Sequence, residues 1–414
     1  MENNKRENTI PGYLYALDGL RAVSLILIFI FHSWQASWIT YKIALPSGRY
    51  LFDFEIFQRY GYIAIDSFFV LSGFGLFYPV ARAIFGEGGK ISWREFYIKR
   101  IRRIVPAYFL MLFILLLFPV LSYNIYNTKS ISETFVHFFT HMTFTHIYND
   151  LTAGSVISTA WTLGIEAAFY LVFPLIAEPF SKRPFWTFFI MFIIGQGSRI
   201  FTAGCLDLTS QAITSFPLLY TDIFGWGMLS AYCVVLARNT LKLQDTLKPF
   251  MTVISILSLV VVYFFIKWLS QFNMPDYDTD ASAAFRMIYR FIADGAFALF
   301  LFSTPFAYSF WHKKIWGNRF FIFLSTISYS FYLWHQNIHI FLKKINVPYT
   351  THPPPMTDSS AMDGFVVLSI ILSLLTAVIS TYCIELPISR YGFKGAIEHG
   401  INKMAKKLIS LRRK

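Results

Sequence analysis

The stretch ALDGLRAVSLILIFIFHSW, residues 16–34, places Arg21 and His32 inside the first long apolar run of the chain. A cation and a titratable imidazole are costly inside a membrane, so such side chains usually serve a function. The two residues are eleven positions apart. On an α-helix this spacing leaves them about 20° apart around the axis and about 16 Å apart along it. The stretch therefore predicts one helix face with a charged group near one membrane surface and an imidazole deeper inside.

The composition of the chain is typical of a membrane protein. Of its 414 residues, 55% are hydrophobic and only 14% are charged, whereas about 25% of the residues in soluble domains are charged. We therefore predict an all-α, polytopic membrane protein with about ten transmembrane helices. The predicted spans are residues 20–40, 60–80, 104–122, 161–178, 184–203, 212–236, 248–269, 284–306, 320–342 and 364–385.

The positions of the 36 Lys and Arg residues predict the orientation of the chain. If the N-terminus is cytoplasmic, most of these residues fall in cytoplasmic segments, and the C-terminus is cytoplasmic too. The net charge of +13 then reflects topology, and we predict no nucleic-acid partner. We assign residues 1–395 to a transmembrane domain and residues 396–414 to a basic cytoplasmic tail. The tail is either an amphipathic helix on anionic lipid or disordered.

Four titratable side chains are predicted to share one layer in the outer half of the membrane. The helical rise places His32, Asp66 and Glu166 about 12, 9 and 8 Å from the outer ends of their spans. His335, in SYSFYLWHQN, reaches a similar depth from the other direction. Buried charges need partners, and these groups could serve one another. Structural polar contacts between helices are the alternative interpretation.

Basic residues gather just before the third predicted span, in WREFYIKRIRRIVPAYF. Topology alone explains some of them. The functional interpretation is a site for a phosphate-rich cytosolic ligand. Arg102 and Arg103 are the favoured candidates, because Pro106 and the apolar run follow at once. The full set of predicted ligand-binding residues is Arg102, Arg103, Arg100 and Lys99.

Two other groups are spaced four residues apart and would share a helix face. Glu133, His137 and His141 could bind a metal, but the chain has no HExxH motif and no CxxC motif. We therefore predict no metal site. Arg286, Arg290 and Asp294 could form an ion pair within one helix, or part of a face that binds a sugar or an anion.

Six motifs in order resemble the acyltransferase 3 family of integral-membrane acyltransferases. They are LDGLRA followed by His32, then GYIAIDSFFVLSGF, FYIKRIRRIVPAY, WTLGIEAAFYLVFPL, SYSFYLWH and IELPISRY. The resemblance implies a multi-pass protein of the bacterial cytoplasmic membrane. It also implies transfer of an acyl group from cytosolic acyl-CoA to a hydroxyl group, often of a cell-envelope glycan. Arg21 and His32 correspond to the active pair of the family.

Some family members carry an extracytoplasmic SGNH hydrolase-like domain that completes the transfer. We expect no such domain here, so the chain either acylates its acceptor directly or works with a separate extracytoplasmic partner. We expect no permanently bound cofactor, with acyl-CoA as the donor substrate and acetyl as its acyl group. The alternative function is a proton-coupled transporter or flippase of an envelope precursor, which would also use intramembrane acids and histidines.

The predicted roles of the site residues follow from these expectations. His32 is the general base toward the acceptor hydroxyl or, in a second mechanism, a nucleophile that carries the acyl group. Glu166 or Asp66 orients its imidazole, and Arg21 completes the catalytic set. The predicted contacts to the acceptor come from His335, Tyr332, Trp161 and Arg290.

Overall fold

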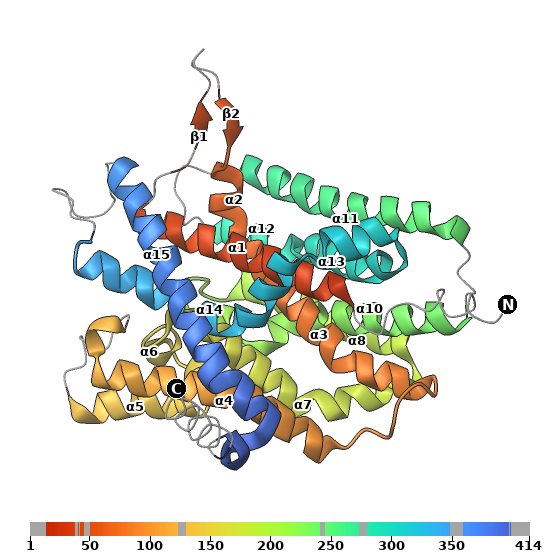
Figure 1. Cartoon of the computed structure of the whole chain (residues 1–414), viewed down its shortest axis with the longest axis horizontal. Coiled ribbons are helices and arrows are strands. Elements are labelled where there is room, and N and C mark those ends of the chain that lie inside the picture. The colour runs from red at the N-terminus through yellow and green to blue at the C-terminus, as the bar shows by residue number, and fades with distance from the viewer. Residues whose placement is uncertain are drawn as a thin grey trace, which may run out of the picture.

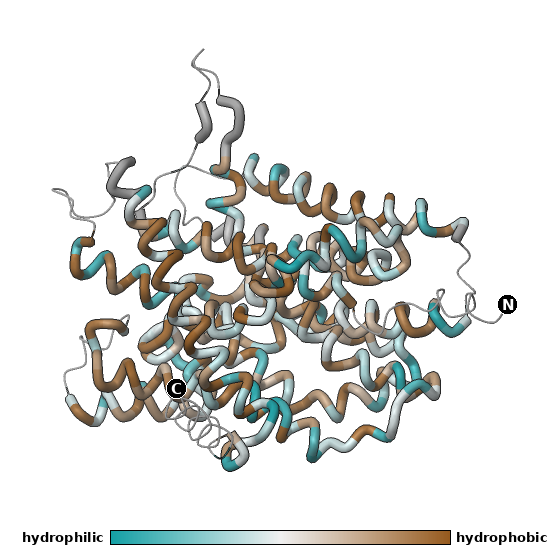
Figure 2. The backbone as a smooth tube through the Cα atoms, viewed as in Figure 1, coloured by the Kyte–Doolittle hydropathy of each residue, from teal (hydrophilic) through white to brown (hydrophobic). Residues whose placement is uncertain are grey.

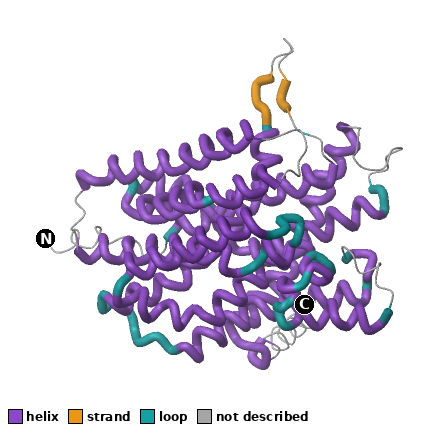
Figure 3. Tube along the Cα trace, turned by 180° about the vertical axis from the view of Figure 1, so that it is seen from behind, coloured by secondary structure: helices purple, strands orange, loops and turns teal. Residues whose placement is uncertain are grey.

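The computed structural model describes residues 14–37, 40, 42–44, 50–122, 130–240, 245–272, 280–347, 359–396 and 398. Helices make up nearly all of this part of the chain (Figure 3). The exception is a short antiparallel hairpin of β1 (Lys42–Ala44) and β2 (Tyr50–Asp53), in which Lys42 lies opposite Asp53. The hairpin projects beyond the helices, as Figure 1 shows. The predicted all-α class is thus confirmed.

Nine of the predicted spans coincide with a single long helix, and the predicted span 284–306 is divided at Arg290 between α12 (Asp280–Tyr289) and α13. These helices are α1 (Tyr15–Ser37), α3 (Ala64–Ile84), α4 (Trp93–Leu117), α7 (Trp161–Lys182), α8 (Pro184–Cys205), α10 (Thr221–Thr240), α11 (Lys248–Leu269), α13 (Phe291–Ser303), α14 (Arg319–Lys344) and α15 (Ser359–Ser380). Eight helical segments of the described chain are long and apolar enough to cross a membrane. The two others, α4 and α14, are as long but carry more polar side chains.

Shorter helices complete the fold between these spans. They are α2 (Glu55–Tyr60), α5 (Ile131–Met142), α6 (Asp150–Ala153), α9 (Gln211–Thr214) and α12 (Asp280–Tyr289). Local signals in the sequence set several helix starts. Ser92 accepts a hydrogen bond from the backbone N–H of Glu95 at the start of α4, and Asn318 accepts one from Phe321 at the start of α14. Such side-chain caps satisfy backbone donors that a first helical turn leaves without partners.

The helices divide into a central group and a peripheral group. Helices α1, α3, α10 and α14 lie in the middle of the bundle, α11 lies along its upper edge, and α15 crosses its front face (Figure 1). The peripheral helices turn large apolar side chains outward, for example Phe189 on α8, Phe264 on α11 and Leu375 on α15. Apolar residues predominate on these helices in Figure 2. This outward apolar surface is what a lipid-facing helix requires, so the chain is a multi-pass membrane protein.

The predicted tail over residues 396–414 lies outside the described residues, apart from residues 396 and 398. Its helical or disordered state therefore stays a prediction. The N-terminal residues 1–13 also lie outside the described part. The cytoplasmic location of both termini continues to rest on the distribution of Lys and Arg.

Two glycines allow α3 and α10 to approach each other closely. A Cβ atom added to Gly227 would lie 2.0 Å from the carbonyl oxygen of Val70, and one added to Gly73 would lie 2.2 Å from that of Phe224. Both obstacles are backbone atoms of the facing helix, which no side-chain rotation can move. Small residues permit such close crossings in membranes. This crossing holds the middle of the bundle in place.

Gly227→Ala should destabilise the protein by about 1–3 kcal/mol, because the added methyl group forces α10 away from α3. The measurement is thermal unfolding of the purified protein in detergent. Gly197→Ala on α8 is the matched control, since a Cβ atom there has open space around it. Equal melting temperatures for the two variants would contradict this account of the crossing.

Candidate active site

Two neighbouring cavities occupy the middle of the helix bundle. The larger, of about 490 Å³, is lined by His32 and is called the histidine cavity below. The smaller, of about 170 Å³, is lined by Arg21, Arg100 and Arg103 and is called the arginine cavity. Helix α1 thus contributes one residue of the predicted pair to each cavity. The helical spacing of Arg21 and His32 explains why one helix reaches both.

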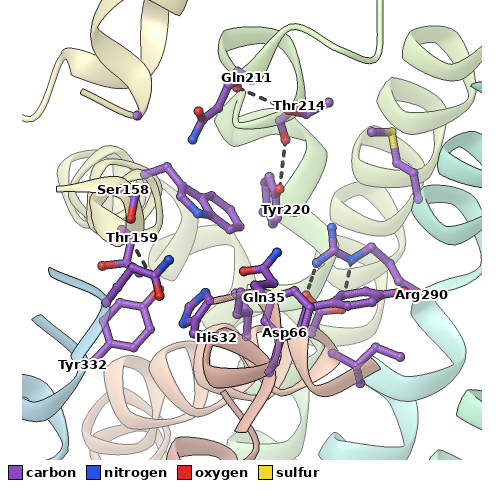
Figure 4. Close-up of a pocket in the computed structure, with 18 of the residues that line it drawn as sticks. His32, Gln35, Asp66, Ser158, Thr159, Gln211, Thr214, Tyr220, Arg290 and Tyr332 are labelled. Carbon is purple, nitrogen blue, oxygen red and sulfur yellow. Dashed lines mark hydrogen bonds and ion pairs between the residues drawn. The ribbon is translucent and has the colours of Figure 1, made fainter. Parts of the chain in front are cut away.

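The histidine cavity is formed by side chains from several helices. Figure 4 shows His32 and Gln35 from α1, with Tyr332 from α14 on one side and Arg290 on the other. Its size falls in the range of about 300–1,000 Å³ that is usual for small-molecule sites. Trp161, predicted to contact the acceptor, also lines it. Five predicted site residues line this cavity, namely His32, Asp66, Trp161, Arg290 and Tyr332. Gln35 was not among the predicted residues, because its polarity gives no distinctive signal.

A buried hydrogen bond joins His32 to His335. Nδ1 of His32 lies 2.7 Å from Nε2 of His335, and the two rings stack with centroids 4.9 Å apart. On its other side, Nδ1 of His335 faces the carbonyl oxygen of Tyr332 at 2.8 Å. This pair connects α1 to α14. The prediction that His335 reaches the depth of His32 agrees with this contact.

The hydrogen-bond partners determine where the protons sit on this pair. A carbonyl oxygen only accepts, so Nδ1 of His335 must carry a proton. Burial without an anionic partner disfavours a charged ring, so the other nitrogen of His335 is an acceptor. Nδ1 of His32 therefore donates, and Nε2 of His32 keeps its lone pair. No described residue bonds this Nε2, and His32 lines the cavity. The site thus presents a base to whatever binds there.

A third histidine, His339, lies one helical turn beyond His335. Its Nε2 is 3.1 Å from the hydroxyl oxygen of Ser33, and the hydroxyl group of Ser33 donates to the carbonyl oxygen of Phe29. His339 is buried and was not selected in the sequence analysis. Its spacing of four from His335 was a signal that could have found it. It gives α1 and α14 a second polar contact beside the first.

Asp66 and Arg290 form a buried ion pair in the wall of the histidine cavity. The guanidinium of Arg290 donates two hydrogen bonds to the carboxylate of Asp66, one of them with Nε 3.0 Å from Oδ2. The pair joins α3 to the start of α13, and the Arg290 guanidinium also lies over the ring of Tyr220. Arg290 therefore pairs across helices instead of with Asp294 on its own helix. Because both charges are compensated, the pair adds little net charge to the cavity.

Neither predicted carboxylate touches His32. Asp66 is engaged by Arg290. Glu166 lines the arginine cavity, where it accepts hydrogen bonds from the hydroxyl groups of Ser72 and Tyr170. The prediction that Glu166 or Asp66 orients His32 is therefore wrong in the structure. His335 bonds the His32 ring instead. The Glu166 carboxylate, on α7, lies in the other cavity.

The arginine cavity collects cations from two helices. Arg21 donates to the hydroxyl oxygen of Ser325 at 3.2 Å, and Ser325 in turn donates to Asp18 at 2.5 Å. Arg100 lies over the ring of Tyr170, with 5.6 Å between Cζ and the ring centroid. Arg103 follows three residues later on the same face of α4. Only one carboxylate, that of Glu166, lines this cavity among the described residues, so its wall is positively charged.

Two residues of the predicted basic set lie elsewhere on α4. Lys99 is exposed and pairs with Glu95, with 3.8 Å between the charged atoms. Arg102 approaches Gly392, beyond the end of α15. Neither lines the arginine cavity. The reason is the helical repeat. Three residues turn the helix by about 300°, so Arg100 and Arg103 lie only about 60° apart and share a face. Lys99 and Arg102 each precede one of these residues by one position, so they are turned about 100° away from that face.

The histidines of the loop before α7 hold that loop together. Nδ1 of His141 lies 2.9 Å from the hydroxyl oxygen of Tyr108 on α4, and its ring stacks on His146 with centroids 4.1 Å apart. Burial lowers the pKa of His146 to about 4. No group of three metal-ligating side chains is found among the described residues. With its pKa lowered this far, the His146 ring is neutral near pH 7 and packs against His141.

Another buried ion pair escaped the sequence analysis. Arg199 on α8 donates to the carboxylate of Asp222 on α10 and to the carbonyl oxygen of Leu219, 2.6 Å away. Both side chains of the ion pair are fully buried. Neither residue stands in a distinctive sequence pattern, and only the fold shows that they are partners. The pair lies outside both cavities.

Asp66→Asn should destabilise the protein by about 3–5 kcal/mol, because it leaves the buried cation of Arg290 without a counter-charge. The double variant Asp66→Asn with Arg290→Gln should recover most of this loss, since it removes both charges together. Thermal unfolding in detergent measures both effects. If the two single losses simply added in the double variant, the side chains would not act as a pair.

Comparisons with known proteins identify the family of the chain. Residues 14–385 match the model of the acyltransferase 3 family, described as an acyltransferase domain. The O-acetyltransferase OatA of Staphylococcus aureus (strain NCTC 8325 / PS 47) is 29% identical over 200 residues, which are 46% of this chain and 30% of that protein. The peptidoglycan O-acetyltransferase OatA of Listeria monocytogenes serovar 1/2a is 24% identical over 176 residues, 41% of this chain and 25% of that protein.

The match thus spans less than a third of the length of these relatives. No solved structure matches the chain. The family model, by contrast, covers every long helix from α1 to α15. It includes both cavities and both residues of the Arg21–His32 pair. This chain belongs to the acyltransferase 3 family.

Proposed function

We propose that this protein is a membrane O-acyltransferase that moves an acetyl group from cytosolic acetyl-CoA to a hydroxyl group of a cell-envelope glycan. The observation that carries the proposal is Nε2 of His32, which no described residue bonds, at the wall of a cavity next to a second cavity rich in arginine. The named activity of the relatives supports the choice of acetyl as the acyl group. The bacterial cytoplasmic membrane is the location that fits such relatives.

The arginine cavity suits the donor. CoA carries several phosphate charges, and guanidinium groups bind phosphate through paired, charge-assisted hydrogen bonds. In the predicted orientation, the start of α4 faces the cytoplasm, where acyl-CoA is made. Arg100 and Arg103 would attract the phosphate-bearing part of the donor, and Arg21 would lie nearer the thioester. No permanently bound cofactor is required, because the thioester already activates the acyl group.

The histidine cavity suits a hydroxyl-rich acceptor. Three buried oxygens in its wall have no hydrogen-bond partner among the described residues: the hydroxyl oxygens of Ser158 and Thr159 and the amide oxygen of Gln336. Buried polar groups are seldom left without partners unless a ligand or water supplies them. A sugar offers many hydroxyl donors, and the face of Trp161 could pack against its ring. Asp66 and Arg290 compensate each other, so the cavity favours a neutral part of the glycan.

In the proposed reaction, His32 removes the proton from the acceptor hydroxyl through Nε2. The hydroxyl oxygen bonds to the acyl carbon, the carbon–sulfur bond breaks, and the thiolate of CoA leaves. The proton held on His32 then returns to the thiolate, which leaves the histidine ready for another cycle. His335 keeps the ring of His32 in the reactive orientation through the 2.7 Å hydrogen bond. The rest of the protein supplies position and shields the reacting groups from water.

His32→Ala should lower transfer at least about 100-fold, because it removes the general base. The assay incubates purified protein in lipid nanodiscs with radiolabelled acetyl-CoA and a peptidoglycan glycan fragment. It measures the release of CoA and alkali-labile label on the glycan.

His137→Ala is the control, since His137 lies on α5 and lines neither cavity. Wild-type transfer by the His32→Ala variant would refute the role of His32. If the wild type released no CoA but carried protons across the membrane of liposomes, the transporter alternative would replace the proposal.

Arg103→Gln should raise the KM for acetyl-CoA about tenfold and change kcat little, because it removes a charge-assisted contact to the donor. Arg94→Gln is the matched control, since Arg94 is exposed on the same helix and lines neither cavity. The effect should shrink at high salt, where exposed charges are screened. An equal KM for both variants would remove Arg103 from the donor site.

A further inference from the structure

The histidine cavity and the arginine cavity meet at a thin partition. Only two of their lining residues, Ile65 on α3 and Tyr332 on α14, border both cavities among the described residues. Ile65 is a compact apolar side chain. Tyr332 is larger, and its hydroxyl group gives it polar contacts that a rotation of the side chain would break. The partition therefore depends mainly on the position of Tyr332.

The hydroxyl group of Tyr332 forms hydrogen bonds with Thr159, just before α7, and with Thr162, within α7. Its hydroxyl oxygen lies 3.1 Å from the hydroxyl oxygen of Thr162 and 3.4 Å from the carbonyl oxygen of Thr159. Thr162 lines the arginine cavity and Thr159 lines the histidine cavity. The ring of Tyr332 packs against Phe68 of α3, with centroids 6.0 Å apart. Three elements thus converge on this one side chain.

We propose that Tyr332 is a gate between the donor and acceptor cavities. With its hydroxyl group held by Thr162 and Thr159, the side chain separates the thioester from the contents of the histidine cavity. When the acceptor is bound, the side chain rotates and the acyl carbon comes within reach of His32. The inference rests on the function proposed above. It assigns Tyr332 as a positioning residue, beyond the contact to the acceptor predicted from the sequence.

The chemistry of the donor explains why such a gate is useful. His32 can remove a proton from water as readily as from a sugar hydroxyl. Water would then add to the acyl carbon, the carbon–sulfur bond would break, and the products would be acetate and CoA carrying the thiol proton. This hydrolysis consumes the donor without modifying the glycan. A closed partition prevents it by keeping water of the histidine cavity away from the thioester.

Tyr332 is also connected by hydrogen bonds to His32, the proposed base. The carbonyl oxygen of Tyr332 accepts the hydrogen bond from Nδ1 of His335, and His335 bonds His32. This contact involves the backbone of residue 332, so rotation of its side chain leaves the histidine pair in place. The side chain itself is held by two hydrogen bonds of moderate length. Such bonds contribute modestly to stability, so they permit opening during turnover.

The test measures two products from the same acetyl-CoA, namely acetate and acetylated glycan. Tyr332→Phe keeps the ring but removes the hydroxyl tether, and Thr162→Val removes one partner of that tether without altering Tyr332. Both variants should raise the ratio of hydrolysis to transfer about tenfold, the factor expected for losing a hydrogen bond. Tyr332→Ala should raise it further, because it also removes the ring from the partition.

Tyr97→Phe is the matched control. This substitution also removes a tyrosine hydroxyl group that donates to a carbonyl oxygen of α7, that of Leu171. Tyr97 borders neither cavity. The ratio should stay at the wild-type value in this variant. An unchanged ratio in both Tyr332→Phe and Thr162→Val would overturn the gate. A loss of transfer without a rise in hydrolysis would overturn it too, because Tyr332 would then only bind or support the acceptor.

A second readout needs no turnover. A thiol introduced by Ser328→Cys, in a chain whose three native cysteines are replaced by serine, reports on the arginine cavity. A membrane-impermeant thiol reagent applied to the extracytoplasmic side should label it at least about tenfold faster when Tyr332→Ala is also present. Equal labelling rates would overturn the gate. Absence of any CoA release by the wild type would instead overturn the proposed function, so the two failures are distinguishable.

Discussion

The hydrogen bond between His32 and His335 is the interaction on which the site depends. It joins two central helices, α1 and α14, at a depth where an unbonded imidazole nitrogen is costly. Because His335 is itself bonded to a backbone carbonyl oxygen, the bond fixes which nitrogen of His32 keeps a lone pair. One contact therefore holds two helices together and determines the chemistry at the cavity wall.

Two buried ion pairs follow the same physical rule. Asp66 pairs with Arg290, and Arg199 pairs with Asp222, each time between different helices. An isolated charge in a membrane interior would be very costly, so each pair constrains which helices must be neighbours. The Asp66–Arg290 pair also leaves the histidine cavity close to neutral, whereas the arginine cavity keeps a positive wall. This contrast in charge supports the proposal of a neutral acceptor in one cavity and an anionic donor in the other.

The proposed reaction poses a problem that two separate cavities would solve. Its donor would be made on one side of the membrane, its acceptor would lie on the other, and water would have to be kept from the thioester between them. Two cavities that meet at Ile65 and Tyr332 would give each proposed substrate a space of its own. The close crossing of α3 and α10 at Gly73 and Gly227 keeps the partition helix α3 in place. Packing far from the reacting groups thus contributes to the site.

The sequence by itself determined the membrane class, the positions of the long helices, and the shared face of Arg21 and His32. These features depend on hydropathy and on the helical repeat, which are local properties of the chain. Only the tertiary structure decided the partners. It gave His32 a histidine instead of Glu166 or Asp66, and it directed Arg100 into the cavity while Arg102 points away. Such pairings depend on how helices distant in sequence pack and rotate against one another, and no local pattern encodes that.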